Sequence, residues 1–205
     1  MSINQSGGFV KSDPGQPEPN FQLYFSPMSY DSAHWPVRRL MNPHPFPGFV
    51  VSLNPCRPSS RGRIEIRSAD PLEPPRIFTH YLSTEHDVGE ALVGVRLLRE
   101  IVATAPLADV IAEPLERGAA GTSNTQLLQD FRARAGTCFH PVGTCSMGAD
   151  PATSVVDAQL RVHGIAALRV VDASIFPTLT SGNTNTPTIM VAEKAADMIT
   201  AEEGE

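Results

Sequence analysis

The sequence predicts an α+β fold in which an antiparallel sheet of short strands is flanked by helices. Most of its 19 prolines fall in the first 75 residues, where they favour strands broken by ordered loops over long helices. Two stretches with helical spacing and capping residues follow, and a third helical stretch lies near the end of the chain. Strands followed by helices, rather than a strict alternation of the two, are typical of the α+β class.

Short strands are predicted in the first half of the chain. Residues 21–25 and 48–53 are mainly apolar, and residues 63–67 alternate charged residues with isoleucine, as a half-exposed strand does. The turn-rich stretch N-P-C-R-P-S-S-R-G precedes residues 63–67 and predicts a hairpin-like link to the strand before it. Residues 76–81 are a candidate for a fourth, paired strand.

The first helix is marked at both ends. Thr84 is placed to cap its N-terminus, and Asp87 in the first turn is favourable against the helix dipole. Pro106 bounds the helix at its other end. One apolar stripe at helical spacing is predicted to form its packing face, with Ile101 beside it: Val88, Leu92, Val95 and Val102.

Two more helices and one more strand complete the prediction. The second helix opens at Ser123 with the capping-box pattern S-x-x-Q. Residues 168–171 form a short buried-type strand. The final helix is expected over residues 187–199, with Thr186 as its cap and Pro187 pre-set for the first turn.

Composition and charge narrow the class of protein. An apolar fraction of 41% and a charged fraction of 19% are globular values, and a net charge of −6 without a basic cluster argues against a nucleic-acid partner. No apolar run approaches the roughly 20 residues that span a membrane. The first residues lack the charged and apolar regions of a signal peptide. We therefore expect no membrane span and a cytoplasmic location.

The three cysteines, Cys56, Cys138 and Cys145, do not make a disulfide framework. Together with His140, the last two form the pattern C-x-H-x4-C, which fits no standard zinc site and lacks a fourth ligand nearby. We expect no metal site and interpret the cysteines as small buried thiols. For Cys138, a place in the lining of a cavity is the open alternative.

Two polar side chains in loops of small residues are candidates for ligand contact. His140 lies in F-H-P-V-G-T-C-S-M-G, and Asn183 lies in S-G-N-T-N-T-P just before the last helix, whose N-terminus offers unpaired N–H groups. A histidine beside an amide donor is a plausible pair of general base and hydrogen-bond donor. A structural histidine in a turn is the alternative, and for His163 in R-V-H-G the turn interpretation is preferred.

Residues 139–199 resemble the C-terminal signature of the glucose–methanol–choline (GMC) family of flavin oxidoreductases. In that family the segment H-P-V-G-T-C-x-M-G carries the catalytic histidine, which matches His140. A second active-site residue, His or Asn, lies in the loop before the last helix and matches Asn183. One position departs from the pattern, because Ser146 stands where many members carry Arg or Lys.

The resemblance implies the oxidation of a small-molecule alcohol with FAD as cofactor. His140 would take the hydroxyl proton, and Asn183 would donate to the developing alkoxide. Asp172 and Ala173 would face the ribityl and pyrophosphate side of FAD, with a plain strand-end cap as the alternative for Asp172. Backbone groups at the start of the last helix would face the pyrimidine ring: Thr184, Asn185 and Thr186.

The resemblance also implies that much of such an enzyme lies outside this chain, because the family's fingerprint G-x-G-x-x-G is absent. Residues 1–139 would be part of the substrate-binding domain. Residues 140–205 would be the catalytic loop and the strand and helix that complete the α/β domain for FAD. The missing N-terminal FAD-binding portion would then be the partner, with a separate chain as one way to supply it. The alternatives are an inactive fragment or subunit and a non-redox enzyme such as a hydroxynitrile lyase.

Overall fold

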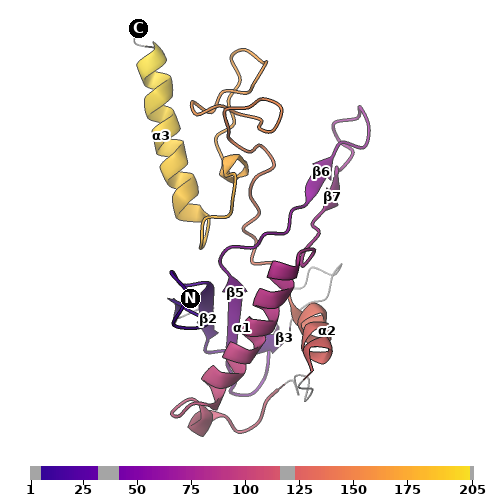
Figure 1. The fold of residues 1–205 in the computed structure, drawn as a ribbon, viewed down its shortest axis with the longest axis vertical. Coiled ribbons are helices and arrows are strands. Elements are labelled where there is room, and N and C mark those ends of the chain that lie inside the picture. The colour runs from indigo at the N-terminus through magenta and orange to yellow at the C-terminus, as the bar shows by residue number, and fades with distance from the viewer. Residues whose placement is uncertain (1–5, 32–41, 116–122, 204–205) are drawn as a thin grey trace. The chain divides into compact units, whose positions relative to one another are not determined.

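The computed structural model describes residues 6–31, 42–115 and 123–203, and the chain forms two compact units (Figure 1). The first unit comprises Met1–Pro55 and Val88–Ala135, and the second comprises Cys56–Asp87 and Gly136–Glu205. Within the described ranges, short antiparallel sheets and three α-helices confirm the predicted α+β class. The functional division predicted between residues 139 and 140 stays a prediction.

A three-stranded antiparallel sheet in the order β1-β2-β5 organises the first unit. Its strands are β1 (Ser6–Val10), β2 (Phe21–Ser26) and β5 (Val50–Pro55), so the two strands predicted for this region are confirmed. The sequence did not predict β1, whose paired glycines are unusual in a strand. A Cβ atom on Gly7 would lie only 2.3 Å from the Leu23 carbonyl oxygen, so the close approach of β2 requires glycine there.

Two smaller antiparallel pairs accompany this sheet. A two-residue pair joins β3 (Tyr30–Asp31) to β4 (Asn42–Pro43), and β6 (Arg63–Glu65) pairs with β7 (Arg76–Phe78). The candidate fourth strand is thus confirmed. The predicted hairpin-like link between β5 and β6 is wrong, because β5 pairs with β2 and β6 pairs with β7.

Helix α1 (Glu85–Ala103) packs on the main sheet through its smallest residues. The Thr84 hydroxyl accepts a hydrogen bond from the Asp87 N–H at 3.2 Å, which confirms the predicted cap. The helix buries Ala91 and Gly94, whereas the predicted apolar stripe is only half-buried. A Cβ atom on Gly94 would lie 2.8 Å from Leu53 Cδ1 and 3.1 Å from Phe21 Cε1. The helix therefore approaches the sheet too closely for larger side chains.

Helix α2 (Asn124–Arg134) completes the described part of the first unit. Ser123 Oγ accepts from the Gln126 N–H at 3.3 Å, so this cap is also confirmed. The helix fully buries Leu127, at 1% exposure.

The segment that links β5 to β6 is held by hydrogen bonds to the side chain of Asp87. One carboxylate oxygen accepts hydrogen bonds from the Ser59 N–H at 2.7 Å and the Ser59 hydroxyl at 3.0 Å, and the other accepts from the Ser60 N–H at 2.9 Å. Burial raises the pKa of Asp87, but bonds from the side chain of Ser60 and from Ser59 outweigh this effect. They lower its pKa from 3.8 to about 2.

Protonation of Asp87 at low pH should therefore lower the free energy of unfolding. Because the folded-state pKa of Asp87 lies below its unfolded value, its contribution of about 2 kcal/mol is present above pH ~4 and disappears between about pH 4 and pH 2. Urea titrations followed by circular dichroism should find Asp87→Asn less stable than wild type at pH 7 and nearly equal to it at pH 2. The exposed Asp197→Asn is the control. A constant difference between wild type and Asp87→Asn across this range would contradict the assignment.

The second unit folds around a small apolar core and helix α3 (Asn185–Glu203), drawn in yellow beside the loops before it (Figure 1). Loops and helix both contribute to this core, which consists of Val156, Leu160, Ile175, Phe176, Val191 and Ala195. The strand predicted at residues 168–171 is wrong. Only an isolated bridge between Arg161 and Arg169 forms there, because a strand needs a continuous hydrogen-bonded neighbour.

The final helix is confirmed, but it begins earlier than predicted. Asn185 is its first residue and Thr184 precedes it, so Thr186, the predicted cap, lies inside the first turn with Pro187. Among the described residues, no helix combines the length and apolar character needed to cross a membrane.

Candidate active site

His140 lies on a loop whose backbone is held at several points. Phe139, just before it, has a φ of 63°, and its N–H donates to the Thr137 hydroxyl at 3.0 Å. Gly143 has a φ of 91°, and a Cβ atom there would lie 3.3 Å from the Phe176 carbonyl oxygen, so this turn favours glycine.

The loop after His140 is then tied to the segment that leads toward α3. The Cys145 N–H donates to the Ser174 carbonyl oxygen at 2.9 Å, and the Met147 N–H donates to the Ile175 carbonyl oxygen at 2.8 Å. Ile175 is a core residue, so these bonds fix the loop to the centre of the second unit.

Asn183 and Thr184 are placed by the start of α3. The Thr184 carbonyl oxygen accepts from the Thr188 N–H at 3.0 Å and from the Thr188 hydroxyl at 2.7 Å. Val191 and Ala195 anchor the helix in the same core as Ile175. The two loops that carry the candidate residues are therefore positioned by one set of apolar contacts.

The fold brings His140 and Asn183 together, although they are far apart in the chain. Asn183 Nδ2 lies 2.7 Å from His140 Nε2, and the Thr184 hydroxyl lies 2.9 Å from His140 Nδ1. Both nitrogens of the imidazole ring are thus engaged by consecutive residues at the start of α3. The two candidate residues are therefore in contact, and their roles as base and amide donor stay a prediction.

Exposure differs on the two sides of the imidazole. Thr184 is buried, with 8% of its surface exposed, whereas Asn183 is exposed. A small molecule can therefore approach the Nε2 side of the ring, where Asn183 lies, while Nδ1 faces the interior. This difference in exposure between the two ring nitrogens suits a base that accepts its proton at Nε2.

The remaining predicted site residues lie in two places. Asn185 and Thr186 are exposed in the first turn of α3, where backbone N–H groups lack partners within the helix. Asp172 caps a 3-10 turn, η2 (Ala173–Ile175), by accepting from the Ser174 N–H at 2.7 Å. Ala173 packs against the core. The cap function offered as the alternative for Asp172 is thus present, and no hydrogen bond among the described residues joins Asp172 to His140.

Three hydroxyl groups near these segments were not predicted. The side chain of Thr184 bonds to His140, whereas the sequence suggested only a backbone role for that residue. Ser174 Oγ and Thr180 Oγ1 are buried without a hydrogen-bond partner in the described part of the chain, an arrangement that costs about 1–3 kcal/mol for each. Both belong to the segment between Asp172 and Asn183. No periodicity or motif distinguishes such hydroxyls from ordinary loop residues.

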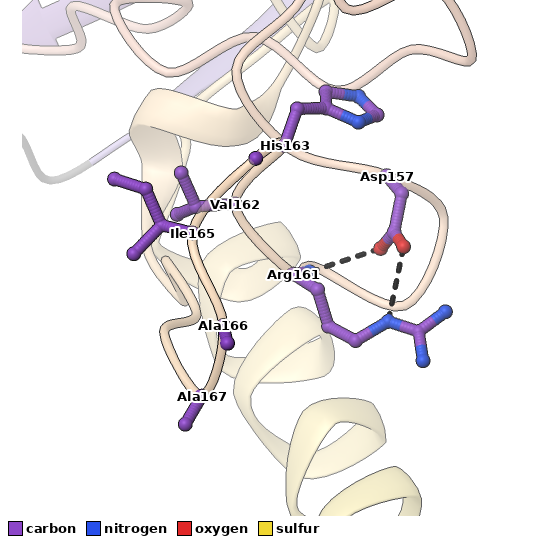
Figure 2. Close-up of a pocket in the computed structure, with 8 residues that line it drawn as sticks. Asp157, Arg161, Val162, His163, Ile165, Ala166 and Ala167 are labelled. Carbon is purple, nitrogen blue, oxygen red and sulfur yellow. Dashed lines mark hydrogen bonds and ion pairs between the residues drawn. The ribbon is translucent and has the colours of Figure 1, made fainter.

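A surface hollow of about 490 Å³ in the second unit is formed by Asp157 and residues 161–167 (Figure 2). Asp157 accepts from the Arg161 N–H at 2.9 Å and from Arg161 Nε at 3.0 Å. His163 Nε2 lies 3.0 Å from the Gly148 carbonyl oxygen and 3.2 Å from Ser154 Oγ. His163 is therefore a turn residue, as expected, and the polar groups of the hollow serve local structure.

The cysteines are free, but they are not all buried. Cys56 is buried, Cys145 is half-buried and Cys138 is exposed, so the expectation of buried thiols is wrong for Cys138. That residue lies beside the exposed Phe139, on the outer part of the loop. The described residues contain no group of three or more His, Cys, Asp or Glu side chains arranged to hold a metal ion.

Comparison with characterised proteins identifies relatives along nearly the whole chain. It is 43% identical to the alcohol dehydrogenase (acceptor) of Pseudomonas putida over 198 residues, and this match covers 97% of the present chain and 35% of the dehydrogenase. It is 42% identical to the mitochondrial choline dehydrogenase of Homo sapiens, with coverage of 95% and 32%. The chain thus spans about a third of the length of these relatives.

Solved structures resemble the fold to a similar extent. Pyridoxine 4-oxidase from Mesorbium loti superposes with a TM-score of 0.80 at 28% identity, covering 95% of this chain and 37% of that one. A formate oxidase of Aspergillus oryzae RIB40, studied for modification of its FAD, gives a TM-score of 0.78 at 28% identity, with coverage of 91% and 32%. A family model described as GMC oxidoreductase matches residues 58–192. The chain therefore belongs to the GMC oxidoreductase family.

Proposed function

We propose that this chain carries the catalytic pair of an FAD-dependent oxidoreductase that acts on the CH–OH group of a small alcohol. The observation that supports this function best is the contact of 2.7 Å between His140 Nε2 and Asn183 Nδ2 on the open side of the imidazole. This contact supports the proposal because an imidazole nitrogen that can accept a proton lies next to an amide that can donate a hydrogen bond.

Proton transfer is the part of the reaction assigned to His140. An alcohol hydroxyl that replaces the present contact between the two side chains meets the Nε2 lone pair on one side and the Asn183 amide on the other. His140 accepts the hydroxyl proton, a role that contributes about 10²–10⁴-fold to a rate. The ring is already held in place at Nδ1 by the Thr184 hydroxyl, at 2.9 Å, so it need not reorient before it accepts the proton.

Stabilisation of the oxygen is the part assigned to Asn183. As the proton leaves, negative charge builds on the alcohol oxygen, and an amide N–H that points at this oxygen stabilises the charge. The same hydrogen bond fixes the orientation of the alcohol. A donor that gains strength as charge develops accelerates the reaction more than it tightens substrate binding.

The residues of the second unit fit a flavin with many hydrogen-bonding groups. Backbone and side-chain groups of Asn185 and Thr186 are exposed at the positive end of α3, and the hydroxyls of Ser174 and Thr180 have no hydrogen-bond partner among the residues that the structure describes. These residues, with Thr184, Asp172 and Ala173, would hold part of FAD. The bound cofactor supplies the acceptor for the hydride that leaves the alcohol carbon.

The relatives support an alcohol as the substrate class, and their length supports the need for an additional N-terminal portion. Two of them are named for alcohol and choline, both of which carry a hydroxyl group on carbon. They are also about three times as long as this chain, so we propose that most of the FAD site is supplied by an N-terminal portion of the kind those relatives contain.

A chimera tests the function directly. The chain replaces the matching 198 residues of the Pseudomonas putida alcohol dehydrogenase, and the product is purified and examined for flavin absorbance. We expect bound flavin that bleaches when a primary alcohol is added without oxygen, because the catalytic pair comes from this chain. The parent enzyme and an Asn183→Leu chimera are the controls, and the variant should bleach about 10²–10³-fold more slowly.

One outcome of the chimera experiment would contradict the proposed function. A chimera that binds flavin with the absorbance of the parent enzyme, but does not bleach with any primary alcohol that the parent oxidises, would contradict the proposed reaction. Retention of flavin shows that the chimera has folded, so loss of bleaching then reflects chemistry.

A further inference from the structure

The hydrogen bonds of the His140 ring select one of its two neutral forms. Asn183 Nδ2 carries only N–H groups, so at 2.7 Å it requires a lone pair on His140 Nε2. With the lone pair on Nε2, the proton of the neutral ring is on Nδ1, where the Thr184 hydroxyl at 2.9 Å is placed to accept it. The Thr184 backbone N–H also points at Nδ1 and would need a lone pair there, but at 3.5 Å it lies at the outer limit of hydrogen-bond distance, so the shorter hydroxyl contact of 2.9 Å outweighs it.

The helix start leaves the Thr184 hydroxyl available for this contact. A threonine just before a helix normally uses its hydroxyl to accept from the N–H of the second or third helical residue. Here the third helical residue is Pro187, which has no N–H. Among the described residues the Thr184 hydroxyl bonds to His140, while the Thr184 carbonyl begins the helix by accepting from Thr188.

The burial of Thr184 makes the contact a fixed one. The residue is 8% exposed, so water has little access to compete for the Nδ1 proton. Its carbonyl accepts the first hydrogen bond of the helix from the Thr188 N–H at 3.0 Å, and the helix is anchored in the core. The hydroxyl is therefore an acceptor that stays at a set position against the ring.

From this geometry we propose that the Thr184 side chain is a positioning residue, which keeps the proton of neutral His140 on Nδ1 and leaves Nε2 ready to accept a proton from the alcohol. The inference rests on the proposed function, since it concerns the same histidine. Without the hydroxyl, the Asn183 amide can turn its oxygen toward a protonated Nε2. A ring in that form has no lone pair on the open side and does not act as a base there.

Nitrogen NMR of the full 205-residue chain measures the proton position without any reaction. The six histidines are labelled with ¹⁵N, and the His140 signals are identified by their loss in His140→Gln. We expect wild type to show the Nδ1–H form and Thr184→Val to shift toward the Nε2–H form. Thr184→Ser, which keeps the hydroxyl, should behave as wild type. Thr184→Ala replaces the valine variant if the latter loses helical circular dichroism.

Thr188→Val is the matched control, because it removes a different hydroxyl bonded to the same residue at the same helix start. It should leave the His140 signals unchanged. Wild type in the Nε2–H form, or a Thr184→Val spectrum identical to wild type, would overturn the inference. So would a Thr188→Val spectrum that shifts as much as that of Thr184→Val.

Kinetics of the flavin-loaded chimera separate this inference from the proposed function. Thr184→Val should lower kcat about tenfold with KM nearly unchanged, and Thr184→Ser should restore kcat. If His140→Ala leaves the rate intact, the proposed function fails whatever the NMR result. If His140→Ala is inactive but Thr184→Val changes neither the ring proton nor kcat, only the positioning role fails.

Discussion

Alanine in place of His140 should slow alcohol-driven bleaching of the flavin by about 10²–10⁴-fold, the usual contribution of a positioned general base. In the proposed reaction the imidazole is the proton acceptor, and Asn183 lies 2.7 Å from its Nε2. Binding of flavin should change little. Stopped-flow absorbance of the flavin-loaded chimera under anaerobic conditions measures the rate.

The same unit offers a histidine of a different kind as the matched control. His163 bonds to the Gly148 carbonyl oxygen and to Ser154 in a turn, so His163→Ala removes an imidazole without touching the pair. Its bleaching rate should stay within about threefold of wild type. Equal rates for His140→Ala and wild type would show that His140 is not the base, and equal losses in both variants would indicate a general loss of structure.

The second large effect concerns stability. Gly94→Val should lower the free energy of unfolding by about 3 kcal/mol, at the upper end of the usual range for overpacking. The new side chain would begin 2.8 Å from Leu53 Cδ1 and 3.1 Å from the ring of Phe21, which is completely buried. Relief requires α1 to move away from the sheet, and this movement exposes apolar surface.

Gly89 provides the matched substitution on the same helix. A Cβ atom at that position meets no atom within 4 Å, and valine has a slightly better helix propensity than glycine. Gly89→Val should therefore be neutral to within about 0.5 kcal/mol. Urea unfolding followed by helical circular dichroism gives both values. A Gly94→Val protein as stable as Gly89→Val would mean that the helix does not lie so close to the sheet.

Local patterns in the sequence predicted the elements that have strong local signals. The caps at Thr84 and Ser123 form as expected, because such bonds depend only on neighbouring residues. The glycine-rich strand β1 and the absence of a strand at residues 168–171 were not predictable in this way. Both outcomes depend on which backbone lies alongside, and this is settled by the tertiary fold.

In the candidate site, too, some features could be predicted from the sequence and others could not. His140 and Asn183 were identified because they stand in a motif resembling that of a known family, and the structure then brought them into contact. The role of the Thr184 hydroxyl could not be predicted from the motif. That role depends on two things: the His140 ring must lie next to the start of α3, and Pro187 must lack an N–H. The proline can be seen in the sequence, but the position of the ring cannot.

The apolar core shared by the two active-site loops has a consequence for how such an enzyme diversifies. Every bond described for the His140 ring, and every core residue behind it, belongs to the second unit. The proposed catalytic pair is thus held by contacts within a single unit. Amino-acid changes in the first unit touch none of these contacts, so that unit can vary in sequence while the arrangement of His140 and Asn183 is kept.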